Sequence, residues 1–180
     1  MEAVEQLLLM LLLGVVLVYL VMVAQFQSLK SPFIVMFTIP LAFTGGFMAL
    51  LLCGMEVSVI SMIGFVMLTG IIVNNGIVLV DYINQLRLEG TECRTAIVTA
   101  GATRMRPILM TTMTTILGLW DMAVNKTAGT AIMQPVAVVC IGGLLYATVM
   151  TLFVVPCIYE LLNKKELRNV REEDLKLLDI

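Results

Sequence analysis

Two adjacent carboxamides, Asn74 and Asn75, are the residues of this sequence whose type and position most need a chemical explanation. They stand in GIIVNNGIVLVDY, within a long run that is otherwise almost entirely apolar. Polar groups at membrane depth cost a few kcal/mol or more unless they are paired, so they indicate function by default. The alternative is that the amides only hold neighbouring helices together, at about 0.6–2 kcal/mol each.

The helical register separates these two amides. On a helix, Asn74 shares a stripe with Gly70, Val78 and Asp81, whereas Asn75 points roughly 100° away. We therefore expect the amides to serve two different faces, so that one shared hydrogen bond cannot account for both. Asp81 comes near the end of the same apolar run, where we expect water to reach it.

A second polar cluster, RMRPILMTTMTT, follows later in the chain and contains four threonines within two helical turns. Thr111 and Thr115 share a helix face, one turn apart. Their hydroxyls could hold water or pair with the amides, or they could bond only their own preceding carbonyls. Arg104 and Arg106 precede Pro107, where a proline suits the start of a helix. For Arg106 we favour a role as a membrane-surface anchor, and for Arg104 both a functional role and anchoring stay open.

The elements that position these residues must lie in a membrane. The chain has 180 residues, of which 60% are hydrophobic and 13% charged, against about 45–50% and 25% in a soluble domain. Its mean hydropathy is +1.02, and a soluble core of this size could not hide so much apolar surface. We therefore predict an all-α integral membrane protein, because an open chain can cross a bilayer only as helix.

The same composition excludes several classes of function. A net charge of −2 gives no reason to expect a nucleic-acid partner. There is no histidine, and the four cysteines lie far apart, so we expect no metal site, no disulfide framework and no cofactor. No nucleophile–base pair or carboxylate cluster stands at a useful spacing, so we do not expect an enzyme.

Five segments are long enough to cross about 30 Å of hydrocarbon as helices of about 20 residues each. Between the third and fourth, the polar segment 84–106 has Ala96, Ile97 and Ala100 at helical spacing, which predicts a short amphipathic surface helix on the cytoplasmic side. Residues 1–162 would form the membrane bundle and 163–180 a cytoplasmic tail. The predicted spans are Leu7–Phe26, Phe33–Cys53, Val57–Tyr82, Pro107–Val124 and Ile132–Leu162.

The basic residues predict an orientation for this multi-pass protein. With the N-terminus outside and the C-terminus in the cytoplasm, ten of the eleven Lys and Arg residues face the cytoplasm, and only Lys126 does not. The opposite orientation reverses that split. An N-terminus placed outside implies a further segment upstream of Met1.

Four stretches in this order carry a family resemblance: YLVMVAQFQSLKSPFIVMFTIPLAFTGG, MIGFVMLTGIIVNNGIVLVDYINQLR, ATRMRPILMTTMTTILGL and IGGLLYATVMTLFVVPCIYELL. Together they resemble the C-terminal transmembrane half of resistance–nodulation–division (RND) efflux transporters, in the hydrophobe/amphiphile branch. The resemblance covers Leu7 to Leu162 and implies helices eight to twelve of twelve. It implies a plasma (inner) membrane transporter that exports hydrophobic or amphiphilic compounds, such as multiple drugs, with protons as the coupling ion. It also implies a homotrimer with a possible membrane-fusion adaptor.

The resemblance also implies site residues. The family's proton carriers are an Asp–Asp pair in the N-terminal half, and Asn74 and Asn75 occupy the pseudo-symmetric position here. An amide has two donors and one acceptor group, so it can bond an acid in either protonation state. Arg104 and Thr111 align with relay residues, and Thr115 and Asp81 could line the same path.

Two departures from the family pattern stand out. Well-studied relatives carry a lysine at the position of Asn74, so coupling here must use hydrogen bonds or water instead of a lysine–carboxylate switch. Trp120 and Asp121 stand where relatives commonly have Leu–Pro, at the outer end of the fourth predicted span.

The resemblance leaves a first half, its acid pair and large periplasmic domains unaccounted for, so we do not expect this chain to transport anything alone. Two other hypotheses stay open. One is an RND-like accessory subunit of protein export, whose cargo would be a secreted chain. The other is a non-transporting helical bundle in which the amides are packing contacts.

Overall fold

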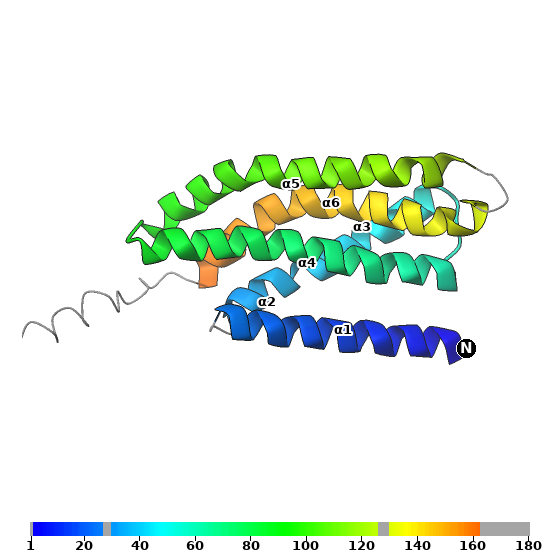
Figure 1. Cartoon of the computed structure of the whole chain (residues 1–180), viewed down its shortest axis with the longest axis horizontal. Helices are drawn as coiled ribbons and strands as arrows, with labels where there is room; N and C mark the ends of the chain where they lie inside the picture. The colour runs from blue at the N-terminus through cyan, green and yellow to red at the C-terminus, as the bar shows by residue number, and fades with distance from the viewer. Residues whose placement is uncertain (1, 27–29, 126–129, 163–180) are drawn as a thin grey trace, which may run out of the picture.

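A computed structural model describes residues 2–26, 30–125 and 130–162, and within these ranges it contains helices and no strand. The helices lie side by side along one long axis (Figure 1). The expected all-α membrane fold is confirmed. In chain order the helices are α1 (Glu2–Phe26), α2 (Lys30–Met36), α3 (Thr38–Leu52), α4 (Val59–Leu88), α5 (Cys93–Val124) and α6 (Thr130–Leu162).

Among the described residues, five helical stretches are long and apolar enough to cross a membrane, as the hydropathy pattern predicts. They are α1, α2 with α3, α4, α5 and α6. The expected separate surface helix in 84–106 is wrong. Its first residues belong to α4 and its last residues belong to α5, with only a short turn between Leu88 and Cys93. Ala96, Ile97 and Ala100, the apolar residues at helical spacing in this segment, are all buried.

The prediction that Pro107 starts a helix is wrong. Pro107 lies inside α5, after helical residues 93–106, and neighbouring helices can support a proline within a membrane helix. The tail 163–180 and Lys126 lie outside the described residues.

The second span is interrupted at Phe37, which separates α2 from α3. Pro40 has no N–H to donate to the carbonyl of Met36, and its ring crowds that carbonyl. The Phe37 N–H still donates to the carbonyl of Phe33, over 3.3 Å. The interruption is therefore local: Phe37 keeps helical φ and ψ of −65° and −17°, and α2 and α3 together form one candidate span.

The ends of α4 are defined by local hydrogen bonds. At its start Ser58 and Ser61 form a reciprocal capping box, with N···O distances of 3.2 and 2.9 Å. At its end Gly90 adopts a left-handed φ of 88°, and the Thr91 N–H donates to the carbonyl of Leu86. This glycine-closed end turns the chain directly into α5, so α4 and α5 form an antiparallel helical hairpin.

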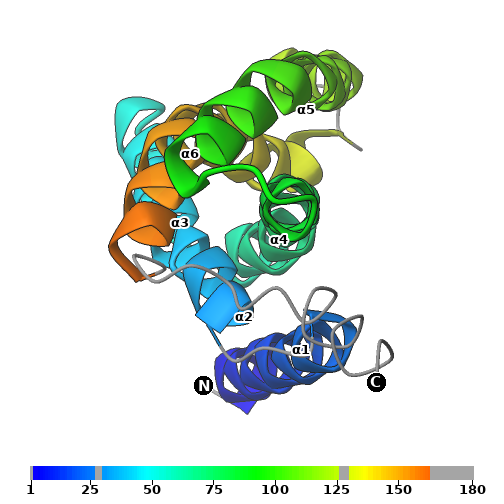
Figure 2. The ribbon, with the colours of Figure 1, turned by 90° about the vertical axis from the view of Figure 1, so that its left-hand side faces the viewer.

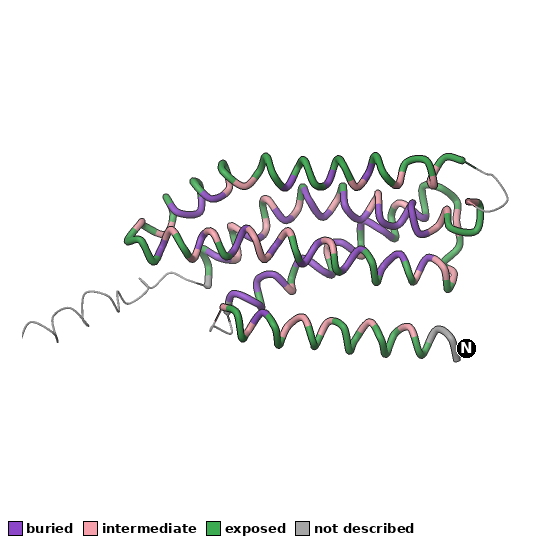
Figure 3. Tube along the Cα trace, in the orientation of Figure 1, coloured by how far each residue is buried: buried purple, intermediate pink, exposed green. Residues whose placement is uncertain are grey.

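Helix α6 is the centre of the bundle and contacts α2, α3, α4 and α5. Figure 3 shows the buried residues concentrated along it and along α3 and α4. The close approach of α6 to α3 depends on Gly142, because a Cβ there would collide with Ala49 and would lie 3.2 Å from the carbonyl oxygen of Gly45. Small residues in membrane helices allow such backbone approach.

Helix α1 stands apart from the rest of the bundle. Only 6% of its spanning window is buried, compared with 50% for α4 and α6. In the end-on view of Figure 2, α2 lies between α1 and the helices beyond it, and α1 contacts only α2 and α4 among the described helices. Its apolar side chains therefore face lipid or a further part of a larger protein.

Candidate functional site

A wide groove between α4 and α5 brings together four of the six residues predicted to form the site. Its volume is about 520 Å³, and Asn74, Asn75, Thr111 and Thr115 line it together with three apolar residues. The apolar lining residues are Met67, Gly70 and Ile71. The α4–α5 hairpin thus places the amides opposite the threonines.

The two amides line the same groove, although adjacent helical positions point in different directions. Asn74 is exposed and Asn75 is half-buried, and the groove is wide enough to include both. Neither amide forms a hydrogen bond with any residue that the structure describes. Each amide group therefore keeps its donors and its acceptor available for a group from outside this part of the chain.

The two groove threonines use their hydroxyl protons locally. Thr111 donates to the carbonyl of Ile108 over 2.9 Å, and Thr115 donates to the carbonyl of Thr111 over 2.8 Å. This is the intrahelical bonding expected as one alternative. It leaves lone pairs on both hydroxyl oxygens, which can accept hydrogen bonds from water or from an amide N–H.

Arg104 and Asp81 lie outside the groove lining. The Arg104 guanidinium carbon is 4.5 Å from the centre of the Tyr82 ring on α4, and the buried Nε has no hydrogen-bond partner among the described residues. Asp81 is exposed, as expected, and so is Arg106. Arg104 thus joins α5 to α4 next to the groove and does not reach into it.

Sequence reasoning missed the contact that fixes the rotation of α5. Thr112 and Thr148 of α6 are both buried, and their hydroxyl oxygens lie 3.1 Å apart. The Thr112 hydroxyl also donates to the carbonyl of Ile108, at 2.9 Å. Because Thr112 faces α6, its neighbour Thr111 faces away from α6 and towards the groove. The sequence signal that could have indicated this contact is a threonine in each of two otherwise apolar helices.

The C-terminal end of α5 differs from the expected Leu–Pro pattern without breaking the helix. Trp120 and Asp121 are exposed, and α5 continues to Val124. The Asn125 amide donates to the Asp121 carboxylate, and Gln134 of α6 donates to the carbonyl of Ala123 over 2.8 Å. These bonds satisfy the polar groups at the helix end and fasten it to α6.

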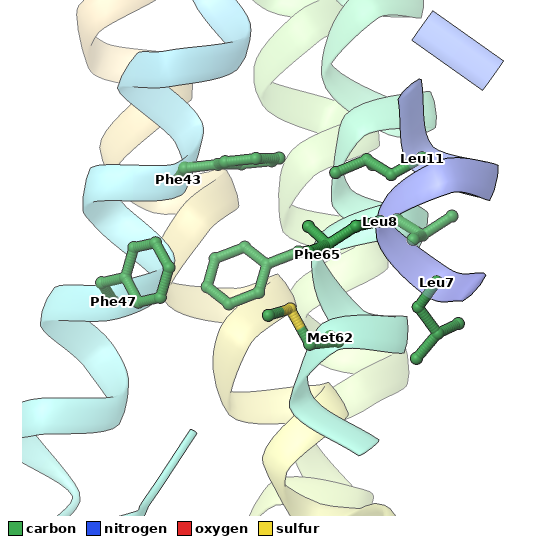
Figure 4. A pocket seen from close by; sticks show the side chains of 8 residues that line it. Leu7, Leu8, Leu11, Phe43, Phe47, Met62 and Phe65 are labelled. Carbon is green, nitrogen blue, oxygen red and sulfur yellow. The ribbon is translucent and has the colours of Figure 1, made fainter. Parts of the chain in front are cut away.

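An apolar cavity of about 210 Å³ lies on the other side of α4, between α1, α3 and α4. Figure 4 shows leucines of α1 facing a row of phenylalanines from α3 and α4. Its lining offers no polar side chain, so this cavity carries no part of a proton path. Within the described residues no group of three His, Cys, Asp or Glu side chains is placed to hold a metal ion.

Comparison with known proteins shows which family the chain resembles. The sequence profile of the AcrB/AcrD/AcrF family matches residues 1–163. The chain is 37% identical over 153 residues to the cobalt-zinc-cadmium resistance protein CzcA of Cupriavidus metallidurans, covering 85% of this chain and 14% of CzcA. It is 40% identical over 154 residues to the swarming motility protein SwrC of Bacillus subtilis, covering 85% of this chain and 15% of SwrC.

Solved structures agree with the sequence matches. Two crystal forms of a heavy metal efflux pump superpose with TM-scores of 0.79 and 0.80, at 33% and 32% identity. They cover 87% and 91% of this chain but 16% of the pump in each case, so the chain spans about a sixth of these relatives or less. The chain therefore belongs to the AcrB/AcrD/AcrF family of RND transporters and corresponds to one transmembrane half of such a protein.

Proposed function

We propose that this chain is the C-terminal transmembrane module of a proton-driven RND efflux transporter. In this proposal the α4–α5 groove is the module's side of a proton relay. One observation carries the proposal: Asn74 and Asn75 line a groove in two membrane-spanning helices and have no hydrogen-bond partner in the described chain. The relay residues would be Asn74, Asn75 and Thr111, with Thr115 beside them.

The unpaired amides of Asn74 and Asn75 need hydrogen-bond partners, and an acidic group fits them. Hydrocarbon satisfies no polar group, so an unpaired amide costs roughly 1–3 kcal/mol as judged from protein mutations. A carboxylate would accept from the amide N–H groups, and a carboxylic acid would donate to the amide oxygen. A neutral amide therefore pairs with an acid in both protonation states, and it adds no fixed charge that would hold the acid ionised. The family's Asp–Asp pair in the N-terminal half is the partner that this surface fits.

Arg104 and Asp81 would have supporting roles at one end of this path. Arg104 is seven residues from Thr111 on α5, or roughly 10 Å along the helix. That distance is beyond the roughly 4–6 Å at which a charge strongly shifts an acid, so Arg104 would support the relay by holding α5 against Tyr82 of α4. Asp81 is exposed on α4 and would serve as a peripheral, water-facing group.

The assembled protein would follow the family plan. It would lie in the plasma (inner) membrane, with the N-terminus of this module outside and its C-terminus in the cytoplasm. The N-terminal half of the same transporter would supply the acids, and a homotrimer would work with a membrane-fusion adaptor. Large periplasmic domains would complete the pump, so this module alone would be inactive.

The cargo is proposed at two levels. The sequence resemblance favours hydrophobic or amphiphilic compounds, whereas the names of CzcA and of the heavy metal efflux pump favour metal cations. Both cargo classes are compatible with the same coupling groove, because coupling and cargo binding use different parts of such a protein. Flux measurements with a dye and with Zn²⁺ on the complete transporter distinguish the two classes.

The relay proposal is tested in proteoliposomes that contain the complete transporter under an imposed proton gradient. We expect Asn74→Leu combined with Asn75→Leu to lower gradient-driven export by roughly tenfold or more, equivalent to about 1.4 kcal/mol. Thr44→Val is the matched control, because the Thr44 hydroxyl is exposed and bonds only the carbonyl of Leu41 on its own helix.

Wild-type export by the Asn74→Leu, Asn75→Leu protein would overturn the proposal. If only thermal stability changed, the non-transporting bundle, with its amides as packing contacts, would be the better description. If the complete protein carried no small cargo but secreted chains accumulated in its absence, the protein-export subunit would replace the efflux assignment.

A further inference from the structure

A second polar network joins three helices and lies outside the relay groove. The Tyr159 hydroxyl of α6 donates to the Asn84 side-chain oxygen of α4 over 2.5 Å, and the Asn84 amide donates to the Ser31 hydroxyl of α2 over 3.1 Å. Tyr159 is 0% exposed and Ser31 is 3% exposed. We call Ser31, Asn84 and Tyr159 the polar clamp. It lies ten residues beyond Asn74 on α4, or roughly 15 Å along the helix.

The tyrosine of this clamp is itself held in place. Arg87, one turn after Asn84, places its guanidinium carbon 5.8 Å from the centre of the Tyr159 ring, and Arg87 is also buried. A cation over an aromatic face restrains the ring in a region that excludes water. The Tyr159 hydroxyl is therefore aimed at Asn84 by contacts on both its ring and its oxygen.

The clamp holds a short helix at the point where the second span is interrupted. Helix α2 joins α3 through Phe37, whose φ and ψ of −65° and −17° remain helical, and the contacts of α2 add to this backbone link. It contacts α1, α4 and α6, and its residues Ile34 and Val35 are 0% exposed. The polar clamp adds directional bonds to this apolar packing, and such bonds specify one arrangement more strictly than apolar contacts do.

The same half-helix touches α4 directly behind the amide pair. A Cβ built on Gly76 would lie 2.9 Å from Cγ1 of Val35, so a larger residue must displace that methyl group or shift α2 against α4. Gly76 follows Asn75 in the chain. A displacement of α2 at this contact therefore moves the backbone that carries Asn75, because packed membrane helices cannot absorb it locally.

We propose that the polar clamp is a positioning device for the relay: it holds α2 against α4 and thereby sets where Asn75 sits in the groove. Its residues act through Val35 and Gly76 and do not touch the relayed proton. The relay part of this inference rests on the proposed function. The mechanical part, that α2 sets the position of Asn75, does not.

The mechanical part is tested by the thiol reactivity of Asn75→Cys in the complete transporter, in a background with the exposed Cys53 and Cys157 replaced by alanine. Tyr159→Phe keeps the ring over Arg87 and removes the hydroxyl that bonds Asn84 and also interacts with Arg87. We expect it to change the rate of maleimide labelling at position 75 at least threefold. Met110→Cys, exposed on α5, is the control position. Tyr159→Phe should change its labelling rate by less than about 1.5-fold, because substitutions have small effects on distant surface positions.

A compensating pair tests the contact itself. Gly76→Ala should change the labelling rate at position 75 in the same way, and adding Val35→Ala should restore it, because the second change removes the methyl groups that the new Cβ meets. Reactivity unchanged in both Tyr159→Phe and Gly76→Ala, with thermal stability lowered, would overturn the inference and leave the clamp as simple packing.

The relay part is read from the pH profile of export. Tyr159→Phe should shift the midpoint of that profile or lower the maximal rate at least threefold while leaving the KM for cargo unchanged; an unaltered profile would overturn this part. If Asn74→Leu with Asn75→Leu leaves export intact while Tyr159→Phe alters labelling, the proposed function fails and the mechanical part stands.

Discussion

The guanidinium carbon of Arg104 lies 4.5 Å from the centre of the Tyr82 ring, so a cation on α5 rests on an aromatic face of α4. Arg87 has a similar relationship with Tyr159, which joins α4 to α6. Both contacts lie within a few turns of the short α4–α5 turn. They therefore tie three helices together at one end of the bundle, beside the buried apolar residues Ile83, Ala100 and Val155.

The first prediction concerns the Arg104–Tyr82 contact. Tyr82→Leu should lower the stability of the chain in detergent by about 1 kcal/mol, since a cation–π contact is worth roughly 0.5–2 kcal/mol depending on its exposure. Tyr82→Phe keeps the aromatic face and should lose less than half of that. Thermal unfolding followed by helical circular dichroism measures both, and equal losses for Leu and Phe would show that the hydroxyl matters instead of the ring.

The second prediction concerns the buried hydroxyl pair of Thr112 and Thr148. Valine matches threonine in shape, so Thr112→Val and Thr148→Val remove the hydrogen bond with little change in packing. A double-mutant cycle in the same unfolding assay should give a coupling energy of about 0.6 kcal/mol and at most about 1.7 kcal/mol, as for other membrane hydrogen bonds. A cycle of Thr112→Val with Thr114→Val is the control, because Thr114 bonds only the carbonyl of Met110. Coupling no larger than in that control would contradict the bond.

The third prediction compares two glycines in helices. A side chain at Gly142 would collide with Ala49 of α3, so Gly142→Val should cost about 3 kcal/mol or more, at the upper end for overpacking. Gly118 of α5 has open space around it, and Gly118→Ala should be neutral or stabilising by up to about 1 kcal/mol. The unfolding midpoints of the two variants should therefore move apart. Similar losses at both positions would mean that α3 and α6 do not approach as closely as described.

The membrane fold could be predicted from the sequence because the bilayer imposes it. A fixed thickness sets the length of each span, and the absence of water forces the chain into helices. The prediction failed at the points where helices are interrupted or continue through a proline. Pro107 suggested a helix start but lies within α5, whereas Pro40 accompanies the break at Phe37. Proline alone does not decide between these outcomes, because neighbouring helices can satisfy the freed carbonyl.

The heights of the groove residues along α4 and α5 could be predicted from the sequence, but the rotation of these helices could not. Asn74 lies 14 residues before Leu88, the end of α4, and Thr111 lies 18 residues after Cys93, the start of α5. In an antiparallel hairpin these positions come to similar heights, roughly 21 and 27 Å from the turn. The surface helix expected in 84–106 obscured this register. The rotation of each helix could not be predicted, because helices that are apolar all round show no inward face.

The polar clamp and the Thr112–Thr148 pair were missed for that same reason. Asn84 was assigned to the surface segment. In the structure its side-chain NH2 donates to Ser31 and its side-chain oxygen accepts from Tyr159, and both of these partners are buried. A polar residue near the end of a span can face water or a neighbouring helix, and only the packing of three helices decides which. The chemistry of a residue type was therefore easier to predict from sequence than its partner.

The fourth prediction concerns the oxygen atoms that face the amides. Thr111 and Thr115 donate to carbonyls of their own helix, so each can contribute to the groove only by accepting a hydrogen bond. Thr111→Val combined with Thr115→Val removes both acceptors and keeps the side-chain shape. In the complete transporter this variant should lower proton-driven export by roughly tenfold, or about 1.4 kcal/mol of barrier.

Stability should hardly change in that variant, since Thr111 is exposed and Thr115 only half-buried, and substitutions at such sites usually stay within about 0.5 kcal/mol. The Thr111→Ser, Thr115→Ser variant restores the oxygens without the methyl groups and should recover most of the export. Thr114→Val, on the same helix but outside the groove lining, should leave export unchanged. If the serine variant fails as badly as the valine variant, the methyl groups and not the oxygens matter, and water or amide bonding at these threonines plays no part in coupling.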